Sequence, residues 1–373
     1  MAKIEVINDR FTGCMLGAAT GDAFGYPLEG MEYEDMCDRF DHIGAIDLAV
    51  SKKTGTALFT DDTQMTLFTA DGILWADMMG GKNGDIDYTE FVFYAYQFWL
   101  YTQTKTVAGK EYAWLFDPSK MKYKTVLLKR KGLFKKRNPS ETNLAALLAA
   151  RNNNYGTPSK AVNNNSDNGG MKRVAPAGLY FCEDTAIAFR MGCEFAAITH
   201  GAPSAYLAGG CYAAIIAEII KGAEVRSAVE KAMEIILEIK GGEECYNALK
   251  KAIEFVDNEN IAPLDAVKQL GTGRSACEAL AIGAFCAMLH RENFRFAIEL
   301  AANHDGSSDT CASICGAILG AYYGEAALPK NWLKKLQYHD LIQYMGDRLY
   351  DASGVMEKFA DNGAEDEEEE EEE

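Results

Sequence analysis

Two series of glycines, each spaced at four residues, constrain the fold of this chain more than any other feature of its sequence. One series lies near the amino terminus and the other near residue 320: Gly13, Gly17, Gly21 and Gly25, and Gly316, Gly320 and Gly324. Residues four apart lie on one face of an α-helix, so each series predicts a smooth stripe on which another backbone packs closely. Each helical glycine costs about 1 kcal/mol relative to alanine. Close packing or the approach of a ligand must offset that cost, and the spacing alone assigns no glycine to catalysis.

The remaining apolar residues also follow a helical spacing, and alternating runs typical of strands are scarce. Five segments are predicted to be helices, several of them apolar on nearly every face and therefore deeply buried: 86–101, 206–220, 225–240, 276–290 and 311–323. Hydrophobic residues make up 48% of the 373 residues, which is enough for one large core, and the chain has only eight prolines. The sequence therefore predicts an all-α fold in a single compact helical domain.

The charge distribution argues against nucleic-acid binding. The formal net charge is -18, and nine of the acids form the uninterrupted run 365–373, which leaves -9 on the rest of the chain. This body has no basic excess to bind phosphates. No run of about 18 uncharged apolar residues is present, so no membrane span is expected, and the amino terminus lacks the apolar core of a signal peptide.

The ten cysteines are scattered through apolar runs, without a Cys-x-x-Cys pair. We interpret them as buried free thiols in a reducing compartment, which predicts a soluble, cytoplasmic protein.

Two segments differ in composition from the helical body, which we expect to span residues 1–350. Residues 102–167 include a basic stretch at 120–137 and a stretch rich in Asn, Ser and Gly at 152–168. In an acidic protein the basic stretch is more typical of a solvated loop or hairpin than of a phosphate-binding patch, and the second stretch is typical of a loop. The acidic tail, 361–373, is expected to be disordered because its charges repel one another.

The sequence Thr60-Asp61-Asp62-Thr63 precedes an apolar run and marks a helix start. Capping explains it, because an acid in the first turn satisfies free N–H groups and complements the helix dipole. One acid is sufficient for capping, however. Two adjacent acids between two threonines gather several hard oxygens, which suits Mg²⁺ or Mn²⁺. On this motif alone, capping is favoured.

A second oxygen-rich cluster, residues 303–310, repeats this design before the glycine-containing segment 311–323. If the two clusters converge, they can hold two metal ions about 3.5–4 Å apart that activate water and orient an oxygen-rich substrate. A third acid, Glu29, follows Pro27 near the end of the first glycine series. It is either a surface acid or a residue that closes over such a site.

Two further motifs are weaker. The loop 168–170, Asn-Gly-Gly, offers backbone N–H groups to an anion and is followed by Lys172 and Arg173, although such loops are common. His200 is one of five histidines, and a lone histidine before a turn is more often structural than a base or ligand. The sequence contains no Ser/His/Asp spacing, Walker motif or dinucleotide fingerprint.

In their order, these motifs resemble the ADP-ribosylglycohydrolase family, which includes the dinitrogenase reductase-activating glycohydrolase and the hydrolases of ADP-ribosyl-arginine and ADP-ribosyl-serine. Each motif alone is weakly specific, whereas six in the family order are strongly so. The resemblance covers roughly residues 10–345 and rests on six segments: Gly13 to Glu29, Phe59 to Thr63, Asn168 to Pro176, Thr199 to Gly201, Gly271 to Ala281 and Asn303 to Gly324.

The resemblance implies an orthogonal all-α fold with a cleft that holds two Mg²⁺ or Mn²⁺ ions, or a single one. It implies hydrolysis of the bond between the distal ribose C1″ and a protein side chain or a related ADP-ribose conjugate. The implied catalytic residues are Asp61 or Asp62, which takes the proton of water, and Glu29, a mobile acid beside the metals. The implied metal ligands are Thr60, Asp61, Asp62, Asp309 and Thr310. The implied substrate-binding residues are Asn168, Gly169, Gly170 and Met171, with the diphosphate on 169–171, together with His200, Gly271 and Gly273.

The second cluster departs from the family pattern. The family has Asp-x-Asp followed by Ser or Thr, whereas residues 307–310 read Ser-Ser-Asp-Thr, so that Ser307 replaces a carboxylate. Cys311 replaces a threonine, and Lys172 stands where methionine is common. Asp305 is a candidate substitute ligand. Three outcomes remain open: a working centre that recruits Asp305, a single-metal or weak enzyme, or a binder without turnover.

The leading hypothesis is a metal-dependent hydrolase that removes ADP-ribose from a protein or a small conjugate. The alternative is a catalytically impaired ADP-ribose-binding protein, because Ser307 replaces an expected ligand. A purely structural role is the third hypothesis. No nucleic-acid or membrane partner is expected.

Overall fold

The computed structural model describes residues 2–40, 44–81 and 85–355. These residues form helices joined by loops, and within these ranges the chain has no β-sheet, only three isolated bridges. The all-α prediction is confirmed. The acidic tail at 361–373 lies outside the described residues.

The five predicted helices correspond to α4, α8, α9, α12 and α14. The α-helices are α1 (Ala2–Gly25), α2 (Tyr33–Arg39), α3 (Asp61–Met78), α4 (Tyr88–Thr104), α5 (Glu141–Ala149), α6 (Ala175–Tyr180), α7 (Thr185–Ala197), α8 (Pro203–Ile220), α9 (Val225–Leu237), α10 (Glu243–Val256), α11 (Pro263–Leu270), α12 (Ala276–Leu289), α13 (Phe294–Ala302), α14 (Ser308–Tyr323), α15 (Lys330–Leu333) and α16 (His339–Ser353). Short 3₁₀ helices are η1 (Tyr26–Leu28), η3 (Lys110–Phe116), η4 (Leu127–Lys129), η5 (Lys131–Phe134), η6 (Met171–Arg173) and η7 (Glu325–Ala327).

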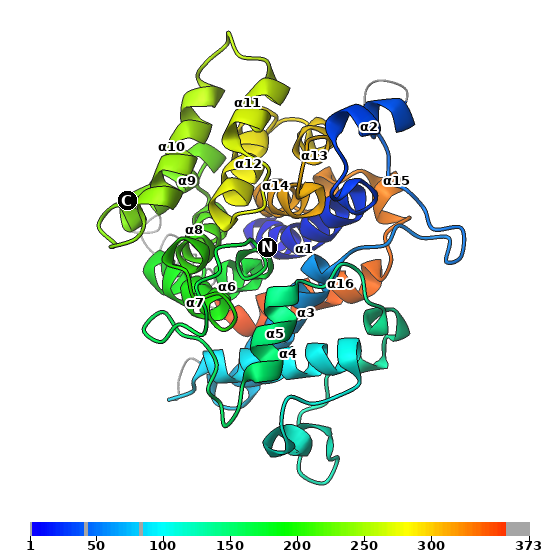
Figure 1. Ribbon diagram of the computed structural model, residues 1–373, viewed down its shortest axis with the longest axis vertical. Coiled ribbons are helices and arrows are strands. Elements are labelled where there is room, and N and C mark those ends of the chain that lie inside the picture. The colour runs from blue at the N-terminus through cyan, green and yellow to red at the C-terminus, as the bar shows by residue number, and fades with distance from the viewer. Residues whose placement is uncertain (1, 41–43, 82–84, 356–373) are drawn as a thin grey trace, which may run out of the picture.

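The two glycine series pack against each other where α1 crosses α14 in the middle of the molecule (Figure 1). A Cβ atom on Gly17 would overlap the carbonyl of Gly316, and one on Gly13 would overlap the carbonyl of Gly320. Further along, Gly25 packs against the backbone at the start of α14. Dense helix packing therefore offsets the propensity cost of these glycines. The contact also fixes the register that brings the end of α1 to the first turn of α14.

Helix α8 fills the core on another side of the molecule. It is the one described helix that is long and apolar enough to cross a membrane, whereas the sequence predicted none. The prediction required a run of apolar residues without any charge, and Glu218 near the end of α8 interrupts that run. In the structure 83% of the apolar span is buried against other parts of the chain. Its apolar composition is therefore that of a core helix.

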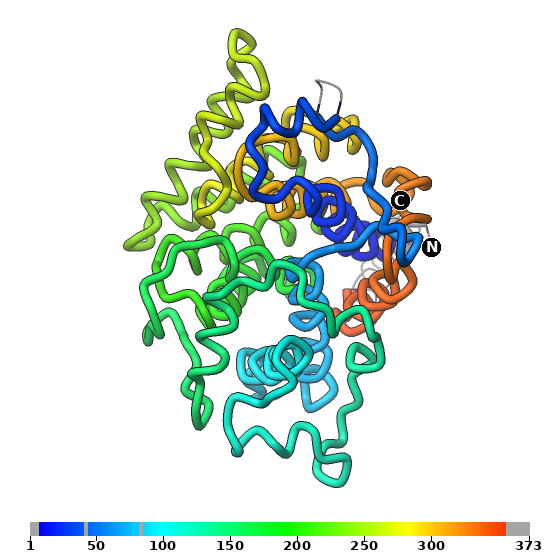
Figure 2. The backbone as a smooth tube through the Cα atoms, turned by 45° about the vertical axis from the view of Figure 1, so that its right-hand side comes forward, coloured from blue at the N-terminus to red at the C-terminus, as the bar shows by residue number. Residues whose placement is uncertain are grey.

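The basic segment, residues 120–137, is a loop with exposed lysines, as predicted, but it contains the two short helices η4 and η5, and η5 packs on α4. Figure 1 and Figure 2 show it, cyan to green, at the end of the molecule beyond α4. Leu127 and Leu133 of η4 and η5 are fully buried, while the lysines between residues 120 and 136 are exposed. Arg137 is the exception, because it is buried and donates from Nη1 to the carbonyl of Phe59 at 3.0 Å. The segment therefore reaches the start of α3 instead of forming a separate unit.

Candidate functional site

The two oxygen-rich clusters meet at the carboxylate of Asp62, which is completely buried. The hydroxyl of Thr60, the N-cap of α3, lies 3.2 Å from Asp62 Oδ1. The hydroxyl of Thr310, in the first turn of α14, donates to Asp62 Oδ2 at 2.7 Å. Residues separated by 248 positions in the sequence thus share one carboxylate. The capping interpretation of the first cluster is also correct, since the Thr60 hydroxyl accepts from the backbone N–H of Asp62.

A buried acid of α1, Asp22, anchors this arrangement. Its carboxylate accepts hydrogen bonds from the backbone N–H groups of Thr60 and Thr63 at 2.9 and 3.0 Å. Burial and the neighbouring Asp62 carboxylate raise the pKa of Asp22 to about 7. Because Asp22 lies one residue after Gly21 of the glycine series, the α1–α14 contact positions the start of α3 as well.

The second cluster pairs Asp309 with Glu29, which follows η1. The two side chains lie close enough for each carboxyl group to affect the pKa of the other. Burial, with the nearby charges of Asp62 and Glu29, raises the pKa of Asp309 well above its ordinary value. Burial also raises the pKa of Glu29. Glu29 Oε2 is buried and has no hydrogen-bond partner among the described residues. This pair therefore holds a proton more readily than ordinary carboxylates do.

Asp61 connects the first cluster with the basic segment and with η6. Its Oδ2 accepts from the backbone N–H of Ser140 at 3.1 Å, and its own N–H donates to the carbonyl of Arg137. Its Oδ1 accepts from the ammonium of Lys172 at 2.9 Å. Burial raises the pKa of Asp61 to about 6 even though Lys172 opposes the shift.

Lys172 extends from η6 into the cluster of carboxylates. Its side chain is 7% exposed, and its Nζ also forms an ion pair with Asp62 Oδ1 that is shorter than the one with Asp61. Burial lowers the pKa of an ammonium, but Asp61, Asp62 and Asp309 outweigh this effect and hold the pKa of Lys172 well above its ordinary value. Lys172 is therefore a permanent positive charge inside the site.

A polar cavity of about 450 Å³ opens over this cluster. Its wall combines the two clusters with residues of the loops around them. The lining residues are Glu29, Asn138, Ser140, Glu141, Thr142, Asp167, Asn168, Lys172, Arg274, Ser307, Asp309 and Thr310. A small, polar, concave site with carboxylates at its base suits a ligand rich in hydroxyl groups.

The Gly-Gly loop lies beside this cavity and packs on His200. A Cβ atom on Gly170 would lie 2.8 Å from His200 Nδ1, and Gly169 donates from its N–H to Asp167 Oδ1 at 2.9 Å. His200 is fully buried and contacts Asp167 Oδ1 through Nε2 at 2.6 Å, so it does not line the cavity as the resemblance implied. Burial lowers the pKa of His200, whereas the contact with His200 outweighs burial and keeps the pKa of Asp167 below its usual range. His200 therefore positions Asp167, which lines the cavity.

The loop 271–275 lies beside the cavity, which its residue Arg274 lines, and it is joined to Asn168 by a hydrogen bond. The side-chain amide of Asn168 donates to the carbonyl of Gly273 at 2.7 Å and to the hydroxyl of Ser307 at 3.2 Å. Gly273 has φ +71°, and a Cβ atom there would overlap the sulfur of Cys311. Gly271 ends α11 and lies against Glu278, outside the lining of the cavity. The Ser307 hydroxyl thus holds the side chain of Asn168 in place.

Two other predicted residues point elsewhere. Asp305 accepts from the backbone N–H of Tyr33 at 2.6 Å, so the carboxylate offered as a substitute ligand caps the start of α2 instead. Met171 is fully buried at the start of η6 and does not line the cavity.

The residues of this site do not fit a pair of divalent cations in the arrangement that the structure shows. Asp61 Oδ1 and Asp62 Oδ1 are both bound to the Lys172 ammonium. Among the described residues, no three His, Cys, Asp or Glu side chains are arranged as a metal site. Asp309 and Thr310, which line the cavity, carry hard oxygens of the type that Mg²⁺ or Mn²⁺ prefers.

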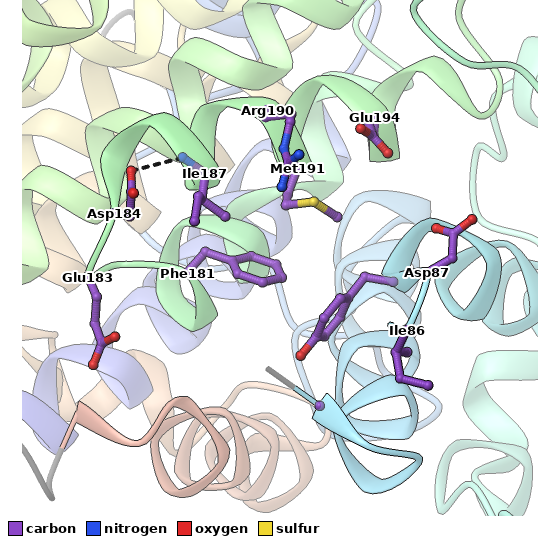
Figure 3. A pocket seen from close by; sticks show the side chains of 11 residues that line it. Ile86, Asp87, Phe181, Glu183, Asp184, Ile187, Arg190, Met191 and Glu194 are labelled. Carbon is purple, nitrogen blue, oxygen red and sulfur yellow. Dashed lines mark hydrogen bonds between the residues drawn. The ribbon is translucent and has the colours of Figure 1, made fainter. Parts of the chain in front are cut away.

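A second cavity, of about 420 Å³, lies between α7 and the start of α4 (Figure 3). Phe181 and Met191 point into it. Of its four acids, Asp87 and Asp184 are the N-caps of α4 and α7, and Glu194 accepts from the hydroxyl of Thr89. None of the clustered carboxylates lines this cavity, so the candidate site is the polar one.

Several residues of the site were not predicted from the sequence. Asp22, Ser140, Asp167 and Arg274 were not singled out, although all four contribute to the site or its support. Two of them had a visible signal: Asp22 is the single charged residue between Gly13 and Gly25, and Asp167 directly precedes the Asn-Gly-Gly loop. Ser140 and Arg274 had none, because only the fold brings them to the cavity.

Comparison with known proteins agrees with this geometry. The model of the ADP-ribosylglycohydrolase family matches residues 4–358. The chain is 25% identical over 343 residues to the ADP-ribosylarginine hydrolase Tri1 of Pseudomonas putida, covering 92% of this chain and 78% of that protein. It is 24% identical over 372 residues to the ADP-ribosylhydrolase ARH3 of Mus musculus, covering 91% of each chain.

An uncharacterized protein of Archaeoglobus fulgidus is 24% identical over 350 residues, covering 92% of this chain and 97% of that protein. A solved structure described as an ADP-ribosylglycohydrolase-related protein complex superposes with a TM-score of 0.55 at 20% identity, covering 94% of this chain and 99% of that one, and so shares the fold. Since the family model spans nearly the whole chain, this protein belongs to the ADP-ribosylglycohydrolase family.

Proposed function

We propose that this chain hydrolyses the bond between C1″ of an ADP-ribose unit and its acceptor, a protein side chain or a small conjugate. The observation that carries the proposal is a cluster of four buried acids beside one polar cavity. Glu29 and Asp309 line this cavity, and Asp61 and Asp62 lie behind its wall, bound to the lining residues Lys172, Thr310 and Ser140. Membership of the family and the hydrolase names of its relatives in Pseudomonas putida and Mus musculus support the same reaction class.

The carboxylates suit the charge that develops during this reaction. When the C1″ bond breaks, positive charge spreads over C1″ and the ring oxygen, and fixed negative groups nearby stabilise it. Asp62 and Asp61 are held in place for this role by Thr310, Thr60, Ser140 and Lys172, so little rearrangement is needed.

Protons move between water, the acceptor and the carboxyl groups. One water oxygen bonds to C1″ as the bond from C1″ to the acceptor breaks. One water proton passes to a carboxylate, Asp61 or Asp62, and the acceptor takes up a proton as it leaves. We assign this proton to the Asp309–Glu29 pair, which lines the cavity and holds a proton more readily than ordinary acids do.

The loop 167–170 and Arg274 supply the remaining recognition. The half-buried carboxylate of Asp167 suits the hydroxyls of ribose, and Arg274 offers a cation to the diphosphate at the cavity wall. We assign the diphosphate to this side of the cavity.

The test is release of ADP-ribose from peptides that carry ADP-ribosyl-arginine or ADP-ribosyl-serine, measured with Mg²⁺, with Mn²⁺ and with EDTA. Asp62→Asn is the inactive control, with an expected loss of at least about 100-fold because two hydroxyls and an ammonium converge on this carboxylate. No release from either peptide under any of the three conditions would refute the proposal.

A second function, ADP-ribose binding without turnover, is favoured by one observation. The Lys172 ammonium neutralises Asp61 and Asp62, the two candidates for the base that accepts the proton of water. Calorimetric titration with ADP-ribose separates the two functions, because saturable binding together with no release supports the binder.

A further inference from the structure

The Lys172 ammonium lies where the oxygens of the first cluster converge. It donates to Asp61 Oδ1 at 2.9 Å and forms an ion pair with Asp62 Oδ1, and its side chain is 7% exposed. The chain segment that carries it is also fixed: the backbone N–H of Lys172 donates to the carbonyl of Asn168, and Gly170 packs on the buried His200. The ammonium is therefore an ordered part of the site and not a surface charge folded inward.

A divalent cation cannot share these oxygens with an ammonium. Mg²⁺ needs its oxygen ligands at about 2.0–2.1 Å, and a cation so close to an ammonium would be strongly repelled in a buried site. The positive charge of Lys172 is already balanced by the two carboxylates it contacts. The position between Asp61 and Asp62 is thus filled by the protein itself.

The rest of the cluster leaves space for one more cation at most. Asp309, Glu29 and Thr310 lie on the cavity side of Asp62. Ser307 adds no charge, and its hydroxyl accepts from Asn168. Asp305 points to Tyr33. No further carboxylate is therefore available from residues 303–308 to balance a second ion.

We propose that the Lys172 ammonium fills a cation position of this site, so that the chain binds at most one divalent cation. The inference rests on the proposed function only for the location of the site, since it requires no turnover. Lys172 is accordingly a positioning residue that holds Asp61 and Asp62 in place of an ion.

The experiment counts bound Mn²⁺ on the full chain after removal of metals with EDTA, by calorimetric titration and by electron paramagnetic resonance. The wild type is expected to bind no more than one Mn²⁺ and to show the spectrum of an isolated ion. Lys172→Met keeps the length of the side chain, removes the charge and is expected to bind one Mn²⁺ more than the wild type. The matched control is Lys221→Met, which loses an ion pair with Glu218 at the end of α8, outside the lining of the polar cavity, and is expected to keep the wild-type count.

Two results would overturn the inference: two spin-coupled Mn²⁺ ions on the wild type, or a folded Lys172→Met chain whose count equals that of the wild type. If circular dichroism shows that Lys172→Met does not fold, Lys172→Gln replaces it, and two Mn²⁺ ions on the wild type would still overturn the inference without any variant. Release of ADP-ribose is assayed in parallel. If the wild type shows the expected ion count but releases no ADP-ribose, the proposed hydrolysis is refuted and the role of Lys172 is unaffected.

Discussion

At the scale of single residues, the site depends on opposite charges that compensate one another away from water. Asp61 and Asp62 are at most 1% exposed, and Lys172 is the cation they contact. A buried pair of this kind adds little when it is intact, but removal of one partner leaves an uncompensated buried charge. Stability and chemistry are therefore linked at Lys172.

We expect Lys172→Met to lower the free energy of unfolding by about 3–5 kcal/mol at pH 8 in EDTA. The loss should be smaller at pH 5, because the carboxyl groups left without a cation can then take up protons. Urea denaturation at the two pH values measures both effects. Lys221→Met, whose side chain is 39% exposed, should change stability by less than about 1 kcal/mol. A loss that is equal at the two pH values would show that packing, not charge, is responsible.

A second prediction concerns the hydroxyl that joins the clusters. Thr310→Val leaves Asp62 Oδ2 without its donor at 2.7 Å and should cost about 1.5–3 kcal/mol, because the acceptor is charged. It should also slow release of ADP-ribose at least about 10-fold. The control is Thr66→Val, since the Thr66 hydroxyl donates only to the backbone carbonyl of Asp62. Equal effects of the two variants on activity would contradict a role for Thr310 in orienting the carboxylate.

At the scale of elements, the contact between α1 and α14 sets the position of the site. Gly13 and Gly25 lie at opposite ends of the same stripe, and each lies too close to the α14 side for a Cβ atom. Gly25, however, meets the backbone of Ser308 and Asp309, whereas Gly13 meets Gly320 and the turn after it. The same kind of contact is structural at one end and positions a carboxylate at the other.

Gly13→Ala and Gly25→Ala form a matched pair. Helix propensity alone would make each variant about 1 kcal/mol more stable, but overpacking should make each about 1–3 kcal/mol less stable. Thermal unfolding measures whether each variant is more or less stable than the wild type. Only Gly25→Ala should also reduce activity strongly at a temperature where both variants are folded, because it displaces Asp309. Similar losses of activity in both would show that the stripe affects the site only through global stability.

The contact between α3 and the basic segment should depend on pH. Asp71 of α3 accepts from the Tyr123 hydroxyl at 2.7 Å, and burial raises its pKa to about 7 although Tyr123 and Thr125 oppose the shift. Lys122, Lys124 and Arg348 line the neighbouring cavity. Between pH 4 and 7 the folded chain keeps a proton on Asp71 that the unfolded chain has released, so this stabilisation is lost as the pH rises.

Asp71→Asn removes this loss. Each pKa unit corresponds to about 1.4 kcal/mol, so the stability of Asp71→Asn relative to the wild type should increase by a few kcal/mol from pH 4 to pH 8. Urea denaturation across this range measures the difference, in which the similar contribution of Asp22 cancels. A constant difference between the two proteins would refute the protonated state of Asp71.

At the scale of the whole molecule, local sequence patterns predicted the helices, whereas the contacts between residues of different helices could be seen only in the structure. The five apolar segments and the two glycine stripes were recognisable because helical spacing is a local property. The direction of the Asp305 side chain and the burial of His200 could not be predicted in this way, because their partners, Tyr33 and Asp167, are far away in the sequence. The sequence showed that Lys172 departs from the family pattern, but it did not show that the Lys172 side chain contacts Asp61 and Asp62.

The shared cavity predicts which parts of the chain a ligand protects. ADP-ribose should slow amide hydrogen exchange in residues 137–142, 167–174 and 306–310, which surround the polar cavity. Peptides from residues 181–194, which line the cavity of Figure 3, should exchange at an unchanged rate and serve as the internal control. Protection confined to 181–194 would move the binding site to that cavity.

The ammonium of Lys172 also has a consequence for how the chain folds. Asp61 and Asp62 must meet a group 111 residues away and then a hydroxyl 248 residues away before the site exists. Mutual repulsion of the acids opposes that convergence, and an external ion would have to arrive before it could be relieved. Because the chain carries its own counter-charge in η6, we expect the rate at which it folds not to depend on the supply of divalent ions.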